Sequence, residues 1–179
     1  RAGEASSRIA PLASAHATAE QIALAREAAR ALYQLGSVPH LMPLLGHPDP
    51  VVRDFAARSG AGGARLCTLL TSDPWPRVRR SAAEGLGLHP QHASCAVSGL
   101  SDSDKAVILW AIRALGEAGL ESSVPALRKL ARNPKRSTDL RSEAVLALGH
   151  MGQFETAHSI LRVHLEHGQL EALAQAAVR

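Results

Sequence analysis

The chain has 179 residues, of which 46% are hydrophobic and only 3% are aromatic, and it carries a formal net charge of +4. This apolar content is enough for a packed core and excludes an intrinsically disordered chain. Alanine and leucine supply most of it, which favours closely packed helices over sheets. Acidic and basic residues are interspersed, and no apolar run is long enough to cross a bilayer, so the surface is expected to be mildly basic, without a nucleic-acid-binding tail or a membrane span.

A short motif built from alanine, leucine and glycine recurs along the chain, and its copies end 27, 27, 29 and 33 residues apart. A period near 30 residues suits two short helices and two turns. The five copies are AARALYQLG (28–36), FAARSGAGG (55–63), AAEGLGLHP (82–90), AIRALGEAG (111–119) and AVLALGHMG (144–152).

Each copy combines small residues, which let a neighbouring helix approach, with bulky residues that fill the space between helices. These core residues are Leu32, Leu86, Leu115 and Leu148. Glycine or proline ends each copy, and a second apolar segment follows. The second helices are expected at 38–45, 64–70, 92–100, 123–131 and 155–167.

The pattern predicts an all-α superhelix of about six stacked antiparallel helix pairs, forming a single domain over residues 1–179. Repeats are expected at roughly 17–46, 49–71, 74–101, 104–132 and 138–168, with partial repeats at 7–15 and 169–179. The second helices are expected to line the concave face. Because the chain begins at Arg1 and stops inside a helical pattern, we expect it to be a piece of a longer protein.

Two copies depart from the pattern. In the second, Gly60, Gly62 and Gly63 stand where leucine and polar residues are expected, so this helix end is predicted to be loosely packed. In the fourth, an apolar segment at 105–110 replaces the Val-Arg pair that the second and third copies carry at 52–53 and 78–79. Such departures are candidate points of contact with a partner.

Three segments resemble a known repeat family: DPVVRDFAARSG (49–60), DPWPRVRRSAAEGLG (73–87) and SVPALRKL (123–130). They are similar to the HEAT-like repeats first described in phycobilisome lyase subunits, and the resemblance covers roughly residue 17 to the end. It implies a HEAT-repeat solenoid and, as one alternative function, a lyase-type subunit acting on a bilin chromophore. This repeat type occurs in scaffolds, lyase subunits, nucleic-acid-binding proteins and regulators, so it indicates a fold rather than an activity.

The cysteines and histidines are the candidates for metal or redox chemistry. Cys67 and Cys95 lie in corresponding regions of neighbouring repeats and are interpreted as small buried hydrophobic residues, with a disulfide or a reactive thiol as the alternative. His89, His92 and Cys95 are spaced by three residues, but no carboxylate accompanies them, so surface histidines beside a buried thiol are favoured over a metal site. No metal and no cofactor are expected.

The favoured function is a protein-interaction scaffold or adaptor that binds a protein or peptide on the concave face. Motifs for nucleophile elbows, phosphate loops and dinucleotide sites are absent from the sequence, so no enzymatic activity is expected. Trp75 lies in a Pro-Trp-Pro turn, where an exposed ring can anchor a partner. The candidate contact residues are Trp75, His40, Arg65, His92, Arg128, Lys129, Arg132, His158 and Arg162.

A second hypothesis uses the longest connection between repeats, at 128–141, where six bases accompany a single acid, Asp139. Such a cluster could bind a polyanion or a nucleic-acid backbone. The chain has no run of aromatic residues alternating with basic ones, so nucleic acid is the less favoured partner. The candidate residues are Arg77, Arg80, Arg128, Lys129, Arg132, Lys135, Arg136 and Arg141.

Overall fold

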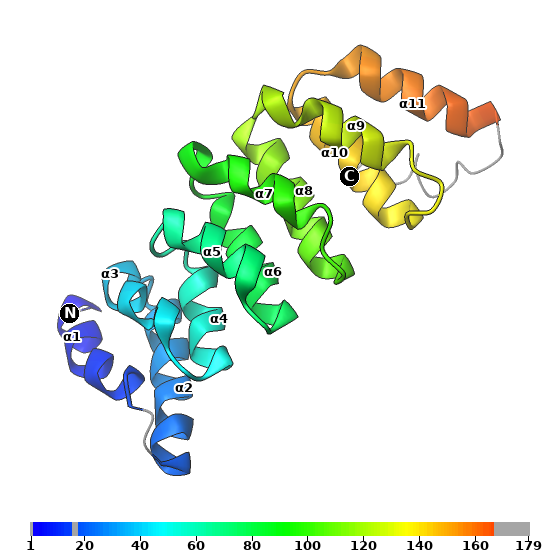
Figure 1. Cartoon of the computed structure of the whole chain (residues 1–179). Helices are drawn as coiled ribbons and strands as arrows, with labels where there is room; N and C mark the ends of the chain where they lie inside the picture. Colours follow the sequence, from blue (N-terminus) through cyan, green and yellow to red (C-terminus); the bar gives the residue numbers. More distant parts are fainter. Residues whose placement is uncertain (1, 16–17, 167–179) are drawn as a thin grey trace.

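The structure is a computed structural model that describes residues 2–15 and 18–166. Throughout these ranges the ordered elements are helices, and helix pairs stack one after another from the N-terminal to the C-terminal end (Figure 1). This confirms the all-α solenoid. The partial repeat expected at 169–179 lies outside the described residues.

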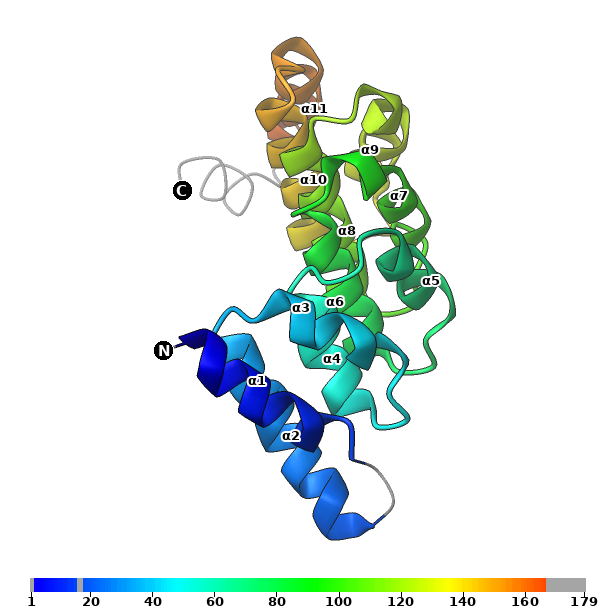
Figure 2. The same ribbon diagram turned by 90° about the vertical axis from the view of Figure 1, so that its left-hand side faces the viewer.

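The helices form two layers. The first helices of the pairs are α2 (Ala19–Gln34), α4 (Pro50–Arg58), α6 (Pro76–Leu86), α8 (Lys105–Ala118) and α10 (Thr138–His150). The second helices are α1 (Ala2–Ala13), α3 (Val38–Leu41) with η1 (Met42–Gly46), α5 (Ala64–Ser72), η2 (Pro90–Cys95) with α7 (Ala96–Gly99), η3 (Glu121–Ser123) with α9 (Val124–Ala131), and α11 (Phe154–Glu166). Figure 2 shows α5, α7 and α9 following one another along one side of the stacked first helices.

Two of the second helices are less regular than the sequence pattern predicts. The helix expected at 38–45 has only four α-helical residues before it tightens into the 3-10 helix η1. Pro43 has no N–H with which to continue the α-helical ladder, and a 3-10 turn resolves this locally. The segment at 92–100 is divided in the same way between η2 and α7.

First helices pack closely through small residues. A side chain at Gly85 in α6 would overlap the carbonyl oxygen of Ala57 in α4. A Cβ at Gly116 in α8 would lie 2.9 Å from the Cβ of Ala147 in α10. The core residues predicted from the repeats are buried in this interior, as expected: Leu32, Leu86, Leu115 and Leu148.

The two layers are spaced differently. α4, α6, α8 and α10 pack directly on one another, whereas α5 and α7 touch more sparingly and an open groove lies between α7 and α9. This difference follows from helix length, since α7 has four residues and α8 has fourteen. The placement of the second helices on the concave face stays a prediction.

The glycine-rich turn between α4 and α5 is well packed, so the prediction of a loose helix end was wrong. Gly60 and Gly63 are buried and Ala61 is fully enclosed. The φ angles of Gly60 and Gly62 are +74° and +77°, a region that L residues with side chains rarely adopt. Glycine lets the chain turn tightly beneath Leu88, and a Cβ at Gly60 would lie 2.8 Å from that side chain.

Candidate partner-binding surface

A ladder of ion pairs joins consecutive repeats. Arg53 binds Asp73 at 2.8 Å and Arg79 binds Asp102 at 2.8 Å, each arginine reaching from a first helix to the turn before the next repeat. Arg26 makes the equivalent contact with Asp49 at 2.7 Å. The hydrogen bond from Arg79 lowers the pKa of Asp102, although partial burial acts in the opposite direction.

Arg53 and Arg79 also hold the turns in front of their own helices. Arg53 Nη1 donates to the carbonyl oxygen of His47 at 2.7 Å, and Arg79 Nη1 donates to that of Asp73 at 2.9 Å. The side chains of Arg53 and Arg79 are only 12% and 14% exposed. These arginines therefore act as clamps between repeats, and they are not available to a partner.

The ladder stops in the fourth repeat, and both partners change there. Ile108 takes the place of the arginine and is buried. Asn133 takes the place of the aspartate and keeps the turn, since its Oδ1 accepts from the amide of Lys135 at 3.0 Å, as Asp102 Oδ1 accepts from that of Asp104 at 2.8 Å. The apolar departure at 105–110 is thus explained by packing at Ile108 and the loss of this ion pair.

The nine ion pairs between side chains that the structure describes all lie in the first helices and their turns. Arg77, a candidate polyanion contact, binds Asp54 at 2.7 Å. Arg80 is half-buried. Arg141 is 4% exposed and its Nε donates to the carbonyl oxygen of Ala131 at 3.2 Å, so its prediction as a polyanion contact was wrong.

The surface around α9 is different, because its cations are not neutralised. None of the five basic residues there forms an ion pair with a described acid. Asp139, the single acid of this connection, is bound by Lys105 of α8. We call these five residues the basic cluster: Arg128, Lys129, Arg132, Lys135 and Arg136.

The other predicted contacts are spread over several second helices. Arg65 is exposed on α5, and His158 and Arg162 are exposed on α11. His40 is half-buried and bonded to the Ser37 hydroxyl at 2.8 Å, and His92 is half-buried in η2. The fold therefore brings together the α9 cations and leaves these other residues separate.

An open groove of about 310 Å³ lies between α7 and α9, beside the basic cluster. Lys129 of α9 and Arg136 of the following turn contribute its basic lining. The rest of the lining is apolar or neutral: Val97, Leu100, Ser101, Ala126, Leu130 and Asn133. We call this the α7–α9 groove.

Trp75 occupies a helix-cap position without capping the helix. Asp49 and Asp104 begin α4 and α8, and each carboxylate accepts from two backbone amides of its helix. Trp75 has the same extended backbone at the start of α6, but it makes no side-chain cap bond and its side chain is 55% exposed. The exposure expected for this ring is confirmed.

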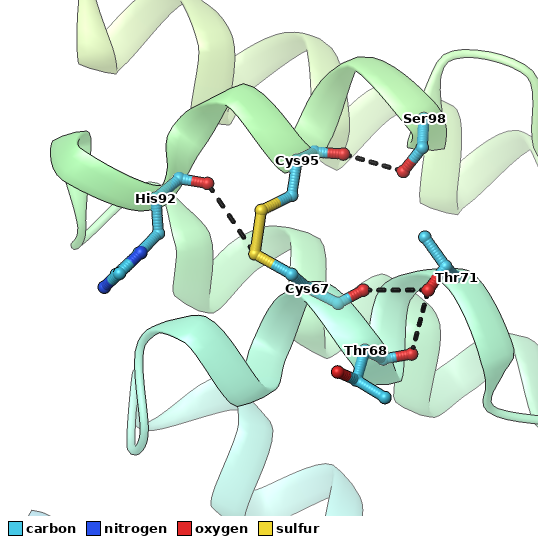
Figure 3. Close-up of a disulfide and its surroundings, with 6 residues drawn as sticks. All are labelled: Cys67, Thr68, Thr71, His92, Cys95 and Ser98. Carbon is cyan, nitrogen blue, oxygen red and sulfur yellow. Dashed lines mark hydrogen bonds between the residues drawn. A yellow bond between two sulfur atoms is a disulfide. The ribbon is translucent and has the colours of Figure 1, made fainter.

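Cys67 and Cys95 form a disulfide, which corrects their interpretation as buried small hydrophobic residues. The bond links α5 to η2 across 28 residues of sequence, with the Cα atoms 5.4 Å apart (Figure 3). Hydroxyl groups flank it: Thr71 Oγ1 donates to the Cys67 carbonyl at 3.0 Å and Ser98 Oγ to the Cys95 carbonyl at 2.7 Å. Corresponding positions in neighbouring repeats were the signal that could have favoured the bridge.

Sequence reasoning also missed a groove on the first-helix side. Trp110 is half-buried and lines a groove of about 360 Å³ between α8 and α10. The Arg113 guanidinium lies 5.0 Å from the centre of the Trp110 ring, and its Nε binds Glu143 at 2.6 Å. The cation that lines this groove is therefore already bound within the chain, by the Trp110 ring and the Glu143 carboxylate.

Within 2–15 and 18–166 there is no group of three histidine, cysteine or acidic side chains arranged to hold a metal ion. Over the same ranges, no helix has the length and apolar character needed to cross a membrane.

Comparisons with solved structures support the fold. A designed armadillo repeat protein in complex with the peptide (KR)4 superposes with a TM-score of 0.60 and 18% identity, covering 83% of this chain and 82% of that one. An engineered protein gives 0.59 and 21%, covering 97% and 87%. The complex of CpcE and CpcF of phycocyanin lyase from Nostoc sp. PCC7120 gives 0.52 and 21%, covering 97% and 80%.

A comparison with curated proteins finds no match. A comparison with protein families gives a match that covers more than half of the chain. The family described as HEAT repeats matches residues 63–138 and 96–179, which together span 63–179. These matches and the stacked helix pairs agree: the chain belongs to the HEAT repeat family.

Proposed function

We propose that the chain is a scaffold that binds a protein or peptide partner along its second-helix surface and the adjoining edge of inter-repeat turns. The helical solenoid supports a binding function because it presents a long, pre-formed surface. A structural neighbour of the same architecture was solved with a bound peptide. The enzymatic alternative has less support, since the likeness to the lyase complex, at 21% identity, extends to the fold alone.

Trp75 carries the proposal. At the equivalent positions of two other repeats, Asp49 and Asp104 stabilise their helices as caps. A cap of this kind contributes about 1 kcal/mol, and α6 forgoes it for an aromatic ring that is 55% exposed. An exposed aromatic residue at a position that favours a helix-capping residue is typical of a binding site, because large amphipathic rings anchor interfaces.

The proposed mechanism is recognition by a surface that is ordered before the partner arrives. The Arg53–Asp73 and Arg79–Asp102 clamps and the Cys67–Cys95 bond fix consecutive repeats relative to one another. Binding to such an array costs little ordering of the scaffold, so that several modest contacts add to a useful affinity.

The test compares two exposed aromatic residues on opposite edges of the array. Trp75 is at an inter-repeat turn, and Phe154, 69% exposed, is at the turn inside a repeat. Proteins that cross-link to the chain in source-cell extract are quantified by mass spectrometry for the unmodified chain, Trp75→Ala and Phe154→Ala. We expect specific partners to fall at least tenfold with Trp75→Ala and to persist with Phe154→Ala. Equal recovery by all three chains would refute the proposed surface.

A further inference from the structure

We propose that the α7–α9 groove binds an acidic peptide segment, which places a carboxylate between Lys129 and Arg136 and an aliphatic side chain on the apolar floor. This inference rests on the proposed function and specifies the chemistry of the partner. It is carried by three features of the groove: its lining, the charge of the turn that closes it, and the pairing state of the neighbouring cations.

The lining combines both kinds of contact that such a peptide needs. Val97 of α7 is 37% exposed, and Leu130 of α9 faces the same groove. Lys129 and Arg136 lie on the same lining, so cationic groups stand beside apolar surface. At about 310 Å³ the groove has room for a few side chains rather than a folded domain. An aliphatic residue flanked by acids matches this arrangement.

The turn at the end of the groove has exchanged acids for other residues. The preceding inter-repeat turn contains Asp102 and Asp104, while this one contains Asn133 and Lys135 in the corresponding hydrogen-bonded turn. Asn133 preserves the backbone geometry and removes the negative charge. In this repeat Ile108 stands where the ladder has an arginine, so no arginine needs an aspartate at this turn. Because the turn carries Asn133 and Lys135 in place of two aspartates, the groove has an uncompensated positive potential.

The neighbouring cations reinforce this potential. Arg128, Arg132 and Lys135 complete the basic cluster, and none of them pairs with a described acid. Arg132 Nη2 instead makes a long contact of 3.5 Å with the Ser159 hydroxyl. Elsewhere in the described chain, most arginines on the first helices form ion pairs with carboxylates. An acidic segment would supply what this surface lacks.

A peptide fits this surface better than a nucleic acid. Phosphate contacts require a run of cations and make no use of an apolar floor. Such a run is not continued across the array, because Arg77 and Arg79 are bound by Asp54 and Asp102 and Arg141 is buried. The aromatic residues on which bases would stack are also absent from the groove lining.

The test uses a defined probe, a fluorescein-labelled eight-residue peptide of alternating glutamate and leucine, and anisotropy titrations with the full chain. Two further peptides replace the glutamates by glutamine or the leucines by serine. We expect each replacement to weaken binding at least tenfold, because the site uses charge and apolar contact together. Equal binding of the serine peptide, or of the glutamine peptide, would overturn the proposal.

Variants locate the site. The double change Lys129→Glu and Arg136→Glu is expected to weaken the glutamate–leucine peptide at least tenfold, and so is Val97→Glu. The matched control is Arg30→Glu, which reverses an exposed cation on the first helix α2 and should change affinity less than twofold. Circular dichroism verifies that each variant remains helical. Equal loss with Arg30→Glu would show diffuse electrostatic attraction and would overturn the groove assignment.

Duplex DNA that binds more tightly than the peptide, and loses affinity with the same groove variants, would overturn the acidic-peptide proposal in favour of nucleic acid.

Two further outcomes separate this inference from the proposed function. Partner capture that depends on Trp75 but is unchanged by the groove variants would leave the scaffold function standing and refute the groove. Conversely, if the groove binds the glutamate–leucine peptide as expected but Trp75→Ala captures partners normally, the groove is supported and the proposed surface at Trp75 is refuted.

Discussion

The first and second helices of the array are stabilised in different ways. The first helices approach closely through Gly85 and Gly116 and are tied to their neighbours by ion pairs. The second helices are shorter, are separated in part by open grooves, and are cross-linked once by the Cys67–Cys95 disulfide. Their exposed cations around α9 find no acidic partner among the described residues.

This difference suggests a division of roles between the layers. Most charged residues of the first-helix layer pair with one another, so substitutions there are expected to act mainly on stability. Residues on the second-helix surface and at the inter-repeat edge are left unsatisfied, so substitutions there are expected to act mainly on binding. Substitutions in each layer test this separation.

Removing the disulfide should have the largest effect. A cross-link that closes a loop of 28 residues restricts the unfolded chain, and its loss should lower the free energy of unfolding by about 3–4 kcal/mol. Urea denaturation of the Cys67→Ala, Cys95→Ala chain measures this. The unmodified chain in reductant should show the same loss, while reductant should leave the double variant unchanged. Equal stability of the oxidised and reduced chains would contradict the structure.

Breaking one clamp of the ladder should come next. Asp102→Asn leaves the half-buried Arg79 guanidinium without its carboxylate and should cost about 2–3 kcal/mol in urea denaturation. Adding Arg79→Ile copies the Ile108 and Asn133 pair of the following repeat and should restore part of the loss. If the double variant lost more free energy of unfolding than the two single variants together, Arg79 and Asp102 would not act as one pair.

The same clamp predicts a pH dependence. Because Arg79 lowers the pKa of Asp102 in the folded chain, the stabilisation is complete above the ordinary aspartate pKa of about 3.9 and is lost as pH falls through the lower folded value. The stability gap between the unmodified chain and Asp102→Asn should therefore be constant at neutral pH and close only in acid below about pH 4. A gap that closed between pH 6 and 8 would point to another group.

Close packing of the first helices predicts a smaller effect. Gly85→Ala would push a Cβ into the Ala57 carbonyl, which belongs to the backbone and cannot rotate away, and should cost about 1–2 kcal/mol. Gly149→Ala is the matched control, because nothing lies within 4 Å of a Cβ there, and it should gain about 0.5–1 kcal/mol from helix propensity. The thermal midpoints of the two variants should therefore move in opposite directions.

Trp75→Asp should have the smallest effect on stability and the opposite sign. An aspartate at this extended backbone position can cap α6, as Asp49 and Asp104 cap α4 and α8, and should add about 1 kcal/mol. The same change should abolish the proposed contact with a partner. Thermal denaturation and cross-linking recovery measure the two effects. A variant that gains stability and keeps its partners would separate Trp75 from binding.

Much of the fold could be predicted from local pattern. Leu86 and Leu115 are buried as their spacing indicates, and the aspartates at 49 and 104 cap helices as turn residues do. The candidate site was less predictable. Arg77 and Arg141 were predicted as polyanion contacts together with Lys129, yet one is paired and one is buried, because their environment is set by residues 10 to 23 positions away.

The sequence by itself determined that this chain stacks helix pairs, since a unit of about thirty residues cannot bury its own apolar side and the repeated leucines and glycines mark each unit. Only the tertiary structure decided which side chains meet across units: Cys67 with Cys95, Arg79 with Asp102, and Lys129 beside an open groove. The physical reason is register. Repeats of unequal length align by packing, and small differences in that alignment determine whether a charged or sulfur-containing side chain is paired, buried or left for a partner.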